Sequence, residues 1–340
     1  MEKLKRFFSS LMFGLMAVCA MTLSACGDDD DDNGGLLLTS ISCQSGSSNY
    51  MNTYCINYDA KLRPYKYSFE YDDFANDILI IDYDNGKMDI PDPDWDGDGV
   101  WPSNLSLSFN SKGYITKVKG SWSYSEDGDN FSGSLEWNAS YDKDGHLTEM
   151  TTTEEEKSDY YDKGISKTTL SWIGGNLVSY NSESKWYDED GQVVESDSST
   201  GIFTYGTQQN KYKQYPAIIS VNDFECLFNM GLFGLGPNNL PTSYNEVYVG
   251  EYEGNKSEYR ENYTSTFTLN DNGSIDTEIW TSSDNYPRKY MYSYSDVNSV
   301  SKGITRSVAM TSTMSASDKA KRIRDFMHKL PFVPKRRSGK

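Results

Sequence analysis

Turns built from aspartate or asparagine followed by glycine recur along this chain of 340 residues. Glycine and asparagine accept the positive φ of a tight hairpin, and an aspartate side chain bonds back to its own backbone. From Gly113 to Gly191 the turn glycines lie 11 to 19 residues apart, which is typical of hairpins with strands of medium length. The turns occupy residues 83–86, 110–113, 126–128, 141–145, 161–164, 173–176, 187–191 and 270–273.

Apolar and polar side chains alternate between the turns. Residues 131–141 place Leu135 and Trp137 on one face and serine, glutamate and asparagine on the other, and Ile275 and Ile279 are expected to share a face. One dry and one wet face predict an antiparallel meander rather than a parallel sheet. Because so many consecutive strands cannot stay flat, we predict an all-β fold. It is a many-stranded antiparallel meander rolled into an open or closed barrel-like sheet, with a short helical tail.

The segment from Ile218 to Gly236 interrupts this pattern. It is strongly apolar and then passes through Gly231, Gly234 and Gly236 to Pro237. Closely spaced glycines before a proline are typical of loops and breaks rather than strands. We therefore predict a short helix or buried loop that plugs one end of the rolled sheet.

Residues 1–25 have the three parts of a secretory signal peptide. Lys3, Lys5 and Arg6 form a basic start, an apolar run follows, and Ser24 and Ala25 precede a cysteine. The ending Leu23-Ser24-Ala25-Cys26 resembles the lipobox of bacterial lipoproteins, which implies cleavage before Cys26 and a lipid on that residue. The apolar run is too short to span a membrane, so we predict a lipid-anchored protein.

Residues 26–49 are predicted to hold the lipidated cysteine and an acidic tether. Asp28 to Asp32 form an unbroken run that resembles the acidic export signal of Bacteroides-type lipoproteins. That resemblance implies an outer-membrane lipoprotein exposed at the cell surface. A solvated, self-repelling spacer is a second interpretation, and the two are compatible.

Charge is distributed unevenly along the chain. The formal net charge is −18, but the first 25 residues are +2 and the segment from Ser301 onward is +9, so the part between is −29. Phosphate would repel such a body, which argues against nucleic acid or an anionic lipid surface as a partner of the predicted β domain, residues 50–298.

The final residues, 299–340, read as a Ser/Thr-rich linker followed by a basic amphipathic helix. Ala320, Ile323 and Phe326 fall on one apolar stripe, with lysines and arginines mostly outside it. Such a helix binds an anionic surface or a partner, or else the tail docks on the acidic body by charge alone.

An acidic loop provides the sharpest local motif. Asp94, Asp96 and Asp98 alternate before Gly99, as in the first half of a calcium-binding loop, with Trp95 and Trp101 beside them. Position 12 of that loop would be Leu105, so the closing glutamate is missing. We keep two interpretations, a structural calcium site and an acidic turn. The two tryptophans are the candidate ligand-binding residues, because rings beside carboxylates suit stacking on sugars.

Cysteines and histidines give little catalytic material. Cys43 and Cys55 either close a disulfide or remain separate thiols, and Cys226 lies in an apolar run. His146 and His328 are the only histidines, too few for a histidine-based zinc site or for a well-supported catalytic triad. We predict that the protein is not an enzyme, with no certain cofactor beyond the candidate calcium.

Three elements together resemble one family of Bacteroides-type lipoproteins, a domain of unknown function with a porin-like β fold. They are the Tyr-Asp-x-x-Gly turns, Trp172 before Gly174-Gly175-Asn176-Leu177, and Leu240-Pro241. The likeness covers about residues 50–297 and implies a rolled antiparallel sheet but no catalytic residues. We therefore predict a surface-anchored lipoprotein that acts as a non-catalytic binding module for a glycan or protein ligand. The alternative is a structural or envelope-assembly lipoprotein with no small-molecule ligand.

Overall fold

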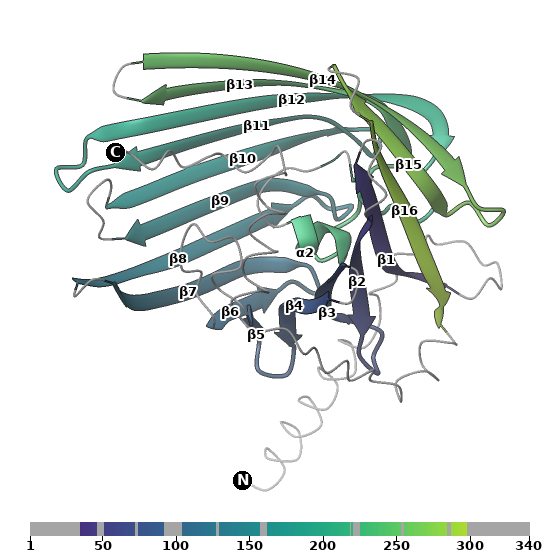
Figure 1. The fold of residues 1–340 in the computed structure, drawn as a ribbon, viewed down its shortest axis with the longest axis horizontal. Helices are drawn as coiled ribbons and strands as arrows, with labels where there is room; N and C mark the ends of the chain where they lie inside the picture. The colour runs from purple at the N-terminus through teal and green to yellow at the C-terminus, as the bar shows by residue number, and fades with distance from the viewer. Residues whose placement is uncertain are drawn as a thin grey trace, which may run out of the picture.

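A computed structural model shows the chain as a closed barrel of sixteen antiparallel strands, in which every strand pairs with its neighbours in sequence and β1 closes the ring on β16 (Figure 1). The prediction of a rolled all-β meander is confirmed, and the ring is closed rather than open. The structure describes residues 35–45, 51–71, 74–91, 104–126, 129–156, 162–217, 219, 225–252, 255–283 and 287–297.

The strands are shortest at β5 and β6, with 3 and 6 residues, and longest from β12 to β14, with 14–17 residues. The strands are β1 Leu36–Ser45, β2 Met51–Tyr58, β3 Pro64–Tyr71, β4 Phe74–Asp82, β5 Lys87–Asp89, β6 Asn104–Phe109, β7 Ile115–Glu126, β8 Asp129–Tyr141, β9 Leu147–Glu156, β10 Lys163–Ile173, β11 Asn176–Tyr187, β12 Val193–Gln209, β13 Asn239–Tyr252, β14 Asn255–Leu269, β15 Ile275–Ser282 and β16 Pro287–Asp296. Among the described residues, the helix α2 Glu225–Asn229 lies inside the ring. No helix in the described part of the chain has the length and apolar character needed to cross a membrane.

Up-and-down connectivity gives the barrel two distinct ends. The turns after the even-numbered strands β2, β4, β6, β8, β10 and β14 gather at one end, which we call the plug end. The long connection between β12 and β13 enters the barrel there, and β1 starts and β16 finishes there. The turns after the odd-numbered strands lie at the opposite end, which we call the mouth.

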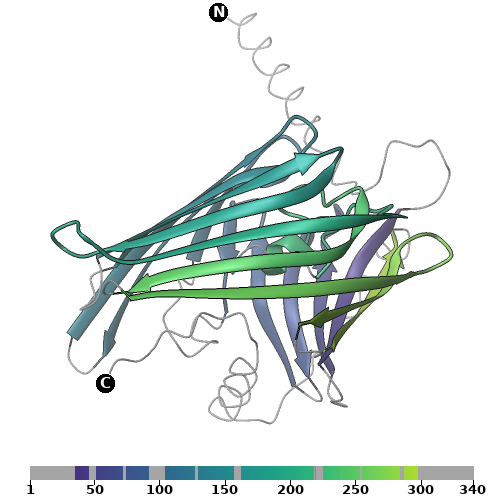
Figure 2. The same cartoon turned by 90° about the horizontal axis from the view of Figure 1, so that it is seen from above.

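The described residues between β12 and β13, which are 210–217, 219 and 225–238 and which we call the plug, lie inside the barrel at this end (Figure 2). Leu227, Phe228, Leu232 and Phe233 are each at most 2% exposed and pack against inward side chains such as Trp137. An interior as wide as that of a sixteen-stranded barrel is too large for wall side chains alone to fill. The prediction that this apolar segment plugs one end is confirmed.

Backbone hydrogen bonds attach the plug to the turns around it. Ile115 N–H donates to the Leu232 carbonyl at 3.0 Å, Leu235 N–H donates to the Gly145 carbonyl at 3.1 Å, and Asn238 N–H donates to the Gly175 carbonyl at 2.9 Å. These bonds satisfy backbone groups that would otherwise be buried without partners.

A buried carboxylate attaches the plug to the wall on the opposite side. Glu278 on β15 is fully buried and accepts hydrogen bonds from the Ala217 backbone N–H at 2.8 Å and the Tyr292 hydroxyl at 2.5 Å. Burial, and then the charge of Glu278, raise the pKa of Tyr292 well above its ordinary value, so the hydroxyl stays a donor.

The tyrosine of the repeated Tyr-Asp turn has a structural role at the plug end. Tyr58, Tyr83 and Tyr141 each point inward and donate a hydrogen bond of 2.6–2.8 Å to a carbonyl near the start of an adjacent odd-numbered strand. Tyr205 repeats the contact with Leu177 at 2.8 Å. Burial raises the pKa of all four hydroxyls, which keeps them protonated.

Charged and small polar side chains cover much of the outer face. Lys117 and Lys119 meet Glu136 there at 2.5 and 2.6 Å, and Lys167 meets Glu149 at 2.8 Å. Exposed apolar residues such as Ile165, Ile173 and Ile202 occur among them, separated by serine, threonine and asparagine. Near the plug, therefore, apolar side chains cover the inner face of each strand and polar side chains cover its outer face.

The structure bears on two expectations from the sequence, namely where the barrel begins and whether Cys43 and Cys55 form a disulfide. The barrel begins at Leu36, inside the segment 26–49 predicted as tether, because β1 finds its partner in β16 far along the chain. No disulfide joins Cys43 and Cys55, since Cys43 packs toward the core while Cys55 lies on the other face of its strand beside inward Ile56. Burial and Glu70 raise the pKa of the Cys55 thiol to about 11.

The expectation that Ile275 and Ile279 share a face is wrong. Ile275 is 2% exposed, but Ile279 is 39% exposed. An irregularity in the pairing of β14 with β15, between Thr268 and Leu269, changes the alternation so that Glu278 and Trp280 point inward instead.

Shortening Phe233 tests whether the plug stabilises the barrel. Its ring is fully buried, with ring centroids of Trp137 and Phe228 each 4.6 Å away. We expect Phe233→Ala to lower the free energy of unfolding by about 3–5 kcal/mol through lost burial and a cavity. Denaturant unfolding measures this, with Ile173→Ala, at a 70% exposed site, as control. Equal small effects from both changes would contradict a stabilising plug.

Candidate binding site on the inner wall

The site residues predicted from sequence lie outside the described residues. This holds for the lipidation site Cys26, for the candidate calcium ligands Asp94, Asp96 and Asp98, and for the candidate ligand-binding residues Trp95 and Trp101. The predicted tail, residues 299–340, lies outside them as well. These remain predictions.

A different set of polar groups lines the inner face of β11 to β14 between the plug and the mouth. We call this face the inner wall. Strand alternation and register place its residues on the same side as the buried core residues Tyr180, Phe203 and Tyr244. Its polar members are Ser182 and Ser184 on β11, Asp197 and Ser199 on β12, Glu246 and Tyr248 on β13, and Tyr259 and Glu261 on β14.

Two copies of the pattern Tyr-x-Glu-x-Tyr stand opposite each other on the inner wall. They are residues 244–248 on β13 and 259–263 on β14. The antiparallel register matches them fully: Tyr244 faces Tyr263, Glu246 faces Glu261, and Tyr248 faces Tyr259. Two carboxylates thus lie directly across from each other, an arrangement that repulsion disfavours unless other groups supply hydrogen bonds.

Hydroxyl groups surround Glu246. Its Oε1 accepts hydrogen bonds from Tyr180 and Ser199, each at 2.7 Å, and the Tyr180 and Tyr244 hydroxyl oxygens lie 2.6 Å apart. Burial, followed by the charge of Glu246, raises the pKa of Tyr180, and burial raises the pKa of Tyr244 still further. Both tyrosines are therefore hydrogen-bond donors at neutral pH.

Glu261 has an oxygen with unused hydrogen-bonding capacity. The Tyr259 hydroxyl donates to its Oε1, while its Oε2 is buried and has no hydrogen-bond partner among the described residues. Nearby on β12, burial raises the pKa of Asp197 in spite of a hydrogen bond from Tyr248. A ligand with hydroxyl or ammonium donors would fit these acceptors.

Exposure changes along the inner wall from plug to mouth. Tyr244 and Tyr263 are 4% and 5% exposed, whereas Tyr259, closer to the mouth on the same face of β14, is 56% exposed. The carboxylates Glu246 and Glu261 lie at the boundary between these regions. A solute that enters from the mouth would therefore contact Glu246 and Glu261 before it reached the buried tyrosines.

A row of aromatic rings below the carboxylates belongs to the core. Phe203, Tyr244, Tyr263, Trp280 and Tyr290 follow one another across five strands with centroids 4.8–5.7 Å apart. All five are at most 8% exposed. Aromatic content therefore fills the barrel here, and these rings are not an exposed platform for sugars.

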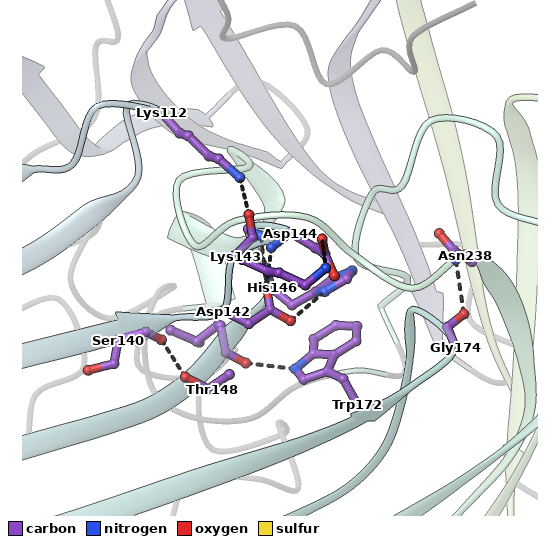
Figure 3. Close-up of polar contacts among 12 residues, drawn as sticks. Lys112, Ser140, Asp142, Lys143, Asp144, His146, Thr148, Trp172, Gly174 and Asn238 are labelled. Carbon is purple, nitrogen blue, oxygen red and sulfur yellow. Dashed lines mark hydrogen bonds and ion pairs between the residues drawn. The ribbon is translucent and has the colours of Figure 1, made fainter.

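The turn between β8 and β9 brings together Asp142, Asp144 and His146, whose potential metal-ligating atoms lie within 4.8 Å of one another (Figure 3). Asp142 Oδ1 accepts the backbone N–H groups of residues 144, 145 and 146, and Oδ2 accepts His146 Nδ1–H at 2.9 Å. Asp59 binds its own turn and Arg63, four residues on, in the same way. We therefore interpret this cluster as a turn clamp and not as a metal centre.

His146 also joins the turn to the wall behind it. Its ring stacks on Trp172 with centroids 4.4 Å apart, and Trp172 donates from Nε1 to the Leu147 carbonyl at 2.7 Å (Figure 3). Gly234 of the plug forms a bridge with the His146 backbone, and a Cβ at Gly234 would lie 2.3 Å from the Gly145 oxygen. These contacts make the histidine a packing residue of the plug end.

Sequence reasoning missed the inner-wall carboxylates although their signal was present. The Tyr-x-Glu-x-Tyr repeats alternate with period two, which indicates that Glu246 and Glu261 share a face with their flanking tyrosines. The sequence interpretation placed glutamates on the wet face of the strands, so Glu246 and Glu261 were not identified as site residues. Only the register of β13 with β14 shows that the two motifs coincide.

Comparisons with known proteins give only distant structural likenesses. No family model matches the chain, and no curated protein matches it. Among solved structures it is similar to a porin-like protein from Bacteroides vulgatus ATCC 8482, with TM-score 0.49, 13% identity and coverage of 76% of this chain and 98% of that one. It is also similar to a porin-like protein from Bacteroides uniformis ATCC 8492, with TM-score 0.43, 16% identity and coverage of 76% and 96%.

Removing the charge of Asp142 tests the turn clamp. Burial raises the pKa of this carboxyl, but hydrogen bonds from His146 and from backbone amides outweigh burial and lower its pKa overall. Its stabilisation is thus present above the ordinary value near ~4 and disappears as pH falls through the lowered pKa. We expect Asp142→Asn to be less stable than the native chain at pH 7 and the difference to shrink toward pH 3. Urea unfolding at several pH values measures this, with exposed Asp144→Asn as control. A difference that stays constant with pH would contradict the clamp.

Proposed function

We propose that this chain is an envelope lipoprotein whose barrel binds a polyhydroxylated ligand, a glycan, on its inner wall without chemically changing it. The observation that supports this most is the pair of opposed Tyr-x-Glu-x-Tyr motifs on β13 and β14. They combine carboxylate acceptors, hydroxyl groups and aromatic edges within one face. Sugar hydroxyls donate to carboxylates, and hydroxyls of the wall both donate and accept.

Charge narrows the class of glycan. The inner wall presents Asp197, Glu246 and Glu261, and the chain from residue 27 to residue 300 has a net charge of −29. Polymers rich in uronate, sulfate or phosphate would be repelled. Neutral sugars, and amino sugars with a free ammonium, are favoured instead.

Hydrogen bonding argues against a catalytic role for Glu246. Two hydroxyls already bind its Oε1, and it faces Glu261 from the same wall rather than across a bound substrate. Glycoside hydrolysis needs an acid and a nucleophile or base on either side of the scissile bond. Turnover of a polysaccharide that Glu261→Gln abolishes would overturn the non-catalytic assignment.

An envelope-assembly lipoprotein with no small ligand is the alternative. It would expose a contiguous apolar patch for a protein partner. Exposed apolar residues on the described outer strands, such as Ile173 and Ile202, are separated by polar ones, which favours the binding module.

Glu246→Gln tests the binding site. The change keeps an acceptor but removes the charge, so we expect at least about a tenfold loss of affinity for a neutral or amino-sugar glycan, since a hydrogen bond to a charged group contributes about 1.5–3 kcal/mol. Calorimetric titration across a glycan panel measures this. Glu183→Gln, an exposed position on the outer face of β11, is the matched control. Unchanged affinity in the Glu246 variant would contradict the site, and no binding by the native chain to any glycan would favour the assembly role.

Cys26→Ala tests the lipid anchor. Without the thiol no lipid can be attached, so we expect the variant to lose labelled palmitate and to leave the membrane fraction of a Bacteroides-type host. Protease added to intact cells then reports surface exposure of the native chain. Membrane retention of the variant at high salt would contradict anchoring through Cys26.

A further inference from the structure

The two faces of strands β11 to β14, which lie side by side in the ring (Figure 1), differ in charge. The outward positions hold as many basic as acidic residues, namely Lys185, Lys256 and Arg260, and Glu183, Glu251 and Glu258. The inward positions of these described strands hold no lysine or arginine, and their acidic residues are Glu195, Asp197, Glu246 and Glu261. The inner face of these strands therefore has a net negative charge, and their outer face does not.

Glycines on the inner wall leave space that neighbouring side chains occupy. A Cβ at Gly250 would lie 2.9 Å from Asp197 Oδ1, so this carboxylate extends from β12 over β13. In the same way, a Cβ at Gly201 would lie 2.2 Å from the Tyr180 ring, whose hydroxyl reaches Glu246 on β13. Asp197 and Glu246 are therefore both presented over β13, and Asp197 lies about 13 Å nearer the mouth.

Trp186 extends this face to the mouth. It faces Gly164 on β10 and Glu195 on β12, close to the turn that follows β11. A Cβ at Gly164 would lie 3.3 Å from Cδ1 and Nε1 of the indole, so the edge of the ring lies against the backbone of β10. The Trp186 side chain is half-buried, and its Nε1–H donates to no described residue. A half-buried indole with an unused donor suits stacking on a sugar ring and a hydrogen bond to a sugar hydroxyl.

The distance between these groups determines the size of ligand that can contact all of them. Trp186 lies six residues beyond Tyr180 on β11, and Tyr180 binds Glu246, so about 20 Å of wall separates the indole from the carboxylate pair. Asp197 lies between them, opposite Ser184. A single sugar is too short to contact all three positions, whereas a linear oligosaccharide laid along the strands is long enough.

We propose that the inner wall binds a linear oligosaccharide of amino sugars with free ammonium groups, which extends from the opposed Glu246 and Glu261 to Trp186. This inference rests on the proposed function and narrows it to one class of glycan. Ammonium groups donate charge-assisted hydrogen bonds to carboxylates. Glu261 Oε2, which is buried and has no hydrogen-bond partner among the described residues, is one acceptor for them. Asp197 is a second acceptor along the same path, and Trp186 contributes stacking on a sugar ring.

The experiment measures the binding of three probes to the full chain from residue 26 with Cys26→Ser, which cannot carry a lipid at that position. The probes are the glucosamine hexamer, the glucosamine dimer, and the N-acetylated hexamer, which has the same length as the first but no ammonium groups. Calorimetric titration is carried out at a pH between the pKa values of the carboxylates and of the sugar amine. We expect the glucosamine hexamer to bind at least about tenfold more tightly than the N-acetylated hexamer, because its hydrogen bonds join two charged groups. It should also bind at least about tenfold more tightly than the dimer, which cannot span the wall.

Two pairs of variants locate the binding on the inner wall. Asp197→Asn should weaken binding of the glucosamine hexamer at least about fivefold, whereas Glu183→Gln, which removes one charge from the outer face of β11, should change it by less than about twofold. Trp186→Ala should weaken binding about fivefold through lost stacking, and Tyr187→Ala, on the outward neighbour, should change it by less than about twofold. Thermal unfolding checks that all four variants fold.

Equal affinity for the two hexamers, equal affinity for hexamer and dimer, or unchanged affinity in the Asp197 or Trp186 variant would each overturn this inference. Binding of neutral glycans alone would also overturn it. All of these outcomes leave the proposed glycan-binding function in place. No binding of any glycan by the native sequence would overturn both, so the two failures are distinguishable.

Discussion

The width of the barrel is the constraint on which the rest of the structure depends. Sixteen strands in a closed ring enclose more space than inward side chains can fill, and an unfilled apolar interior would give up the burial that stabilises the fold. The chain meets this constraint with a second layer of structure inside the ring. The plug fills one half of the interior and leaves the other half to polar side chains.

This division explains why the inner face changes character along single strands. On β13, Leu240 and Tyr244 are buried beside the plug, and Glu246 and Tyr248 follow toward the mouth. The inward side chains change from apolar to acidic without any change in strand geometry. The difference is that the plug lies opposite the first group and not opposite the second. Glu278 shows the limit of the rule, because a carboxylate deep in the dry half persists only with hydrogen bonds from Ala217 and Tyr292.

Much of the architecture was predictable from the sequence because it is encoded locally. Asp-Gly turns and two-residue periodicity define hairpins without reference to distant residues, and the apolar segment after Ile218 breaks that pattern visibly. Closure was not predictable, since the contact of Leu36 with Asp296 depends on the summed twist of fourteen intervening strands. The outward position of Ile279 was not predicted, because an extra residue in β15 where it pairs with Thr268 and Leu269 of β14 changes which residues of β15 face inward. Glu246 and Glu261 form a site only through register, which the spacing of either strand alone does not determine.

Closure of β1 on β16 also determines when the barrel can be completed. The residues that close the ring are up to 260 positions apart, so fifteen pairings between consecutive strands can form before β1 and β16 close it. Until then the growing sheet has two unpaired edges, and such edges recruit other chains. Loop-closure entropy grows slowly with length, so the delay is a matter of kinetics more than of stability. A chain with this topology would need protection from aggregation until its final strand is in place.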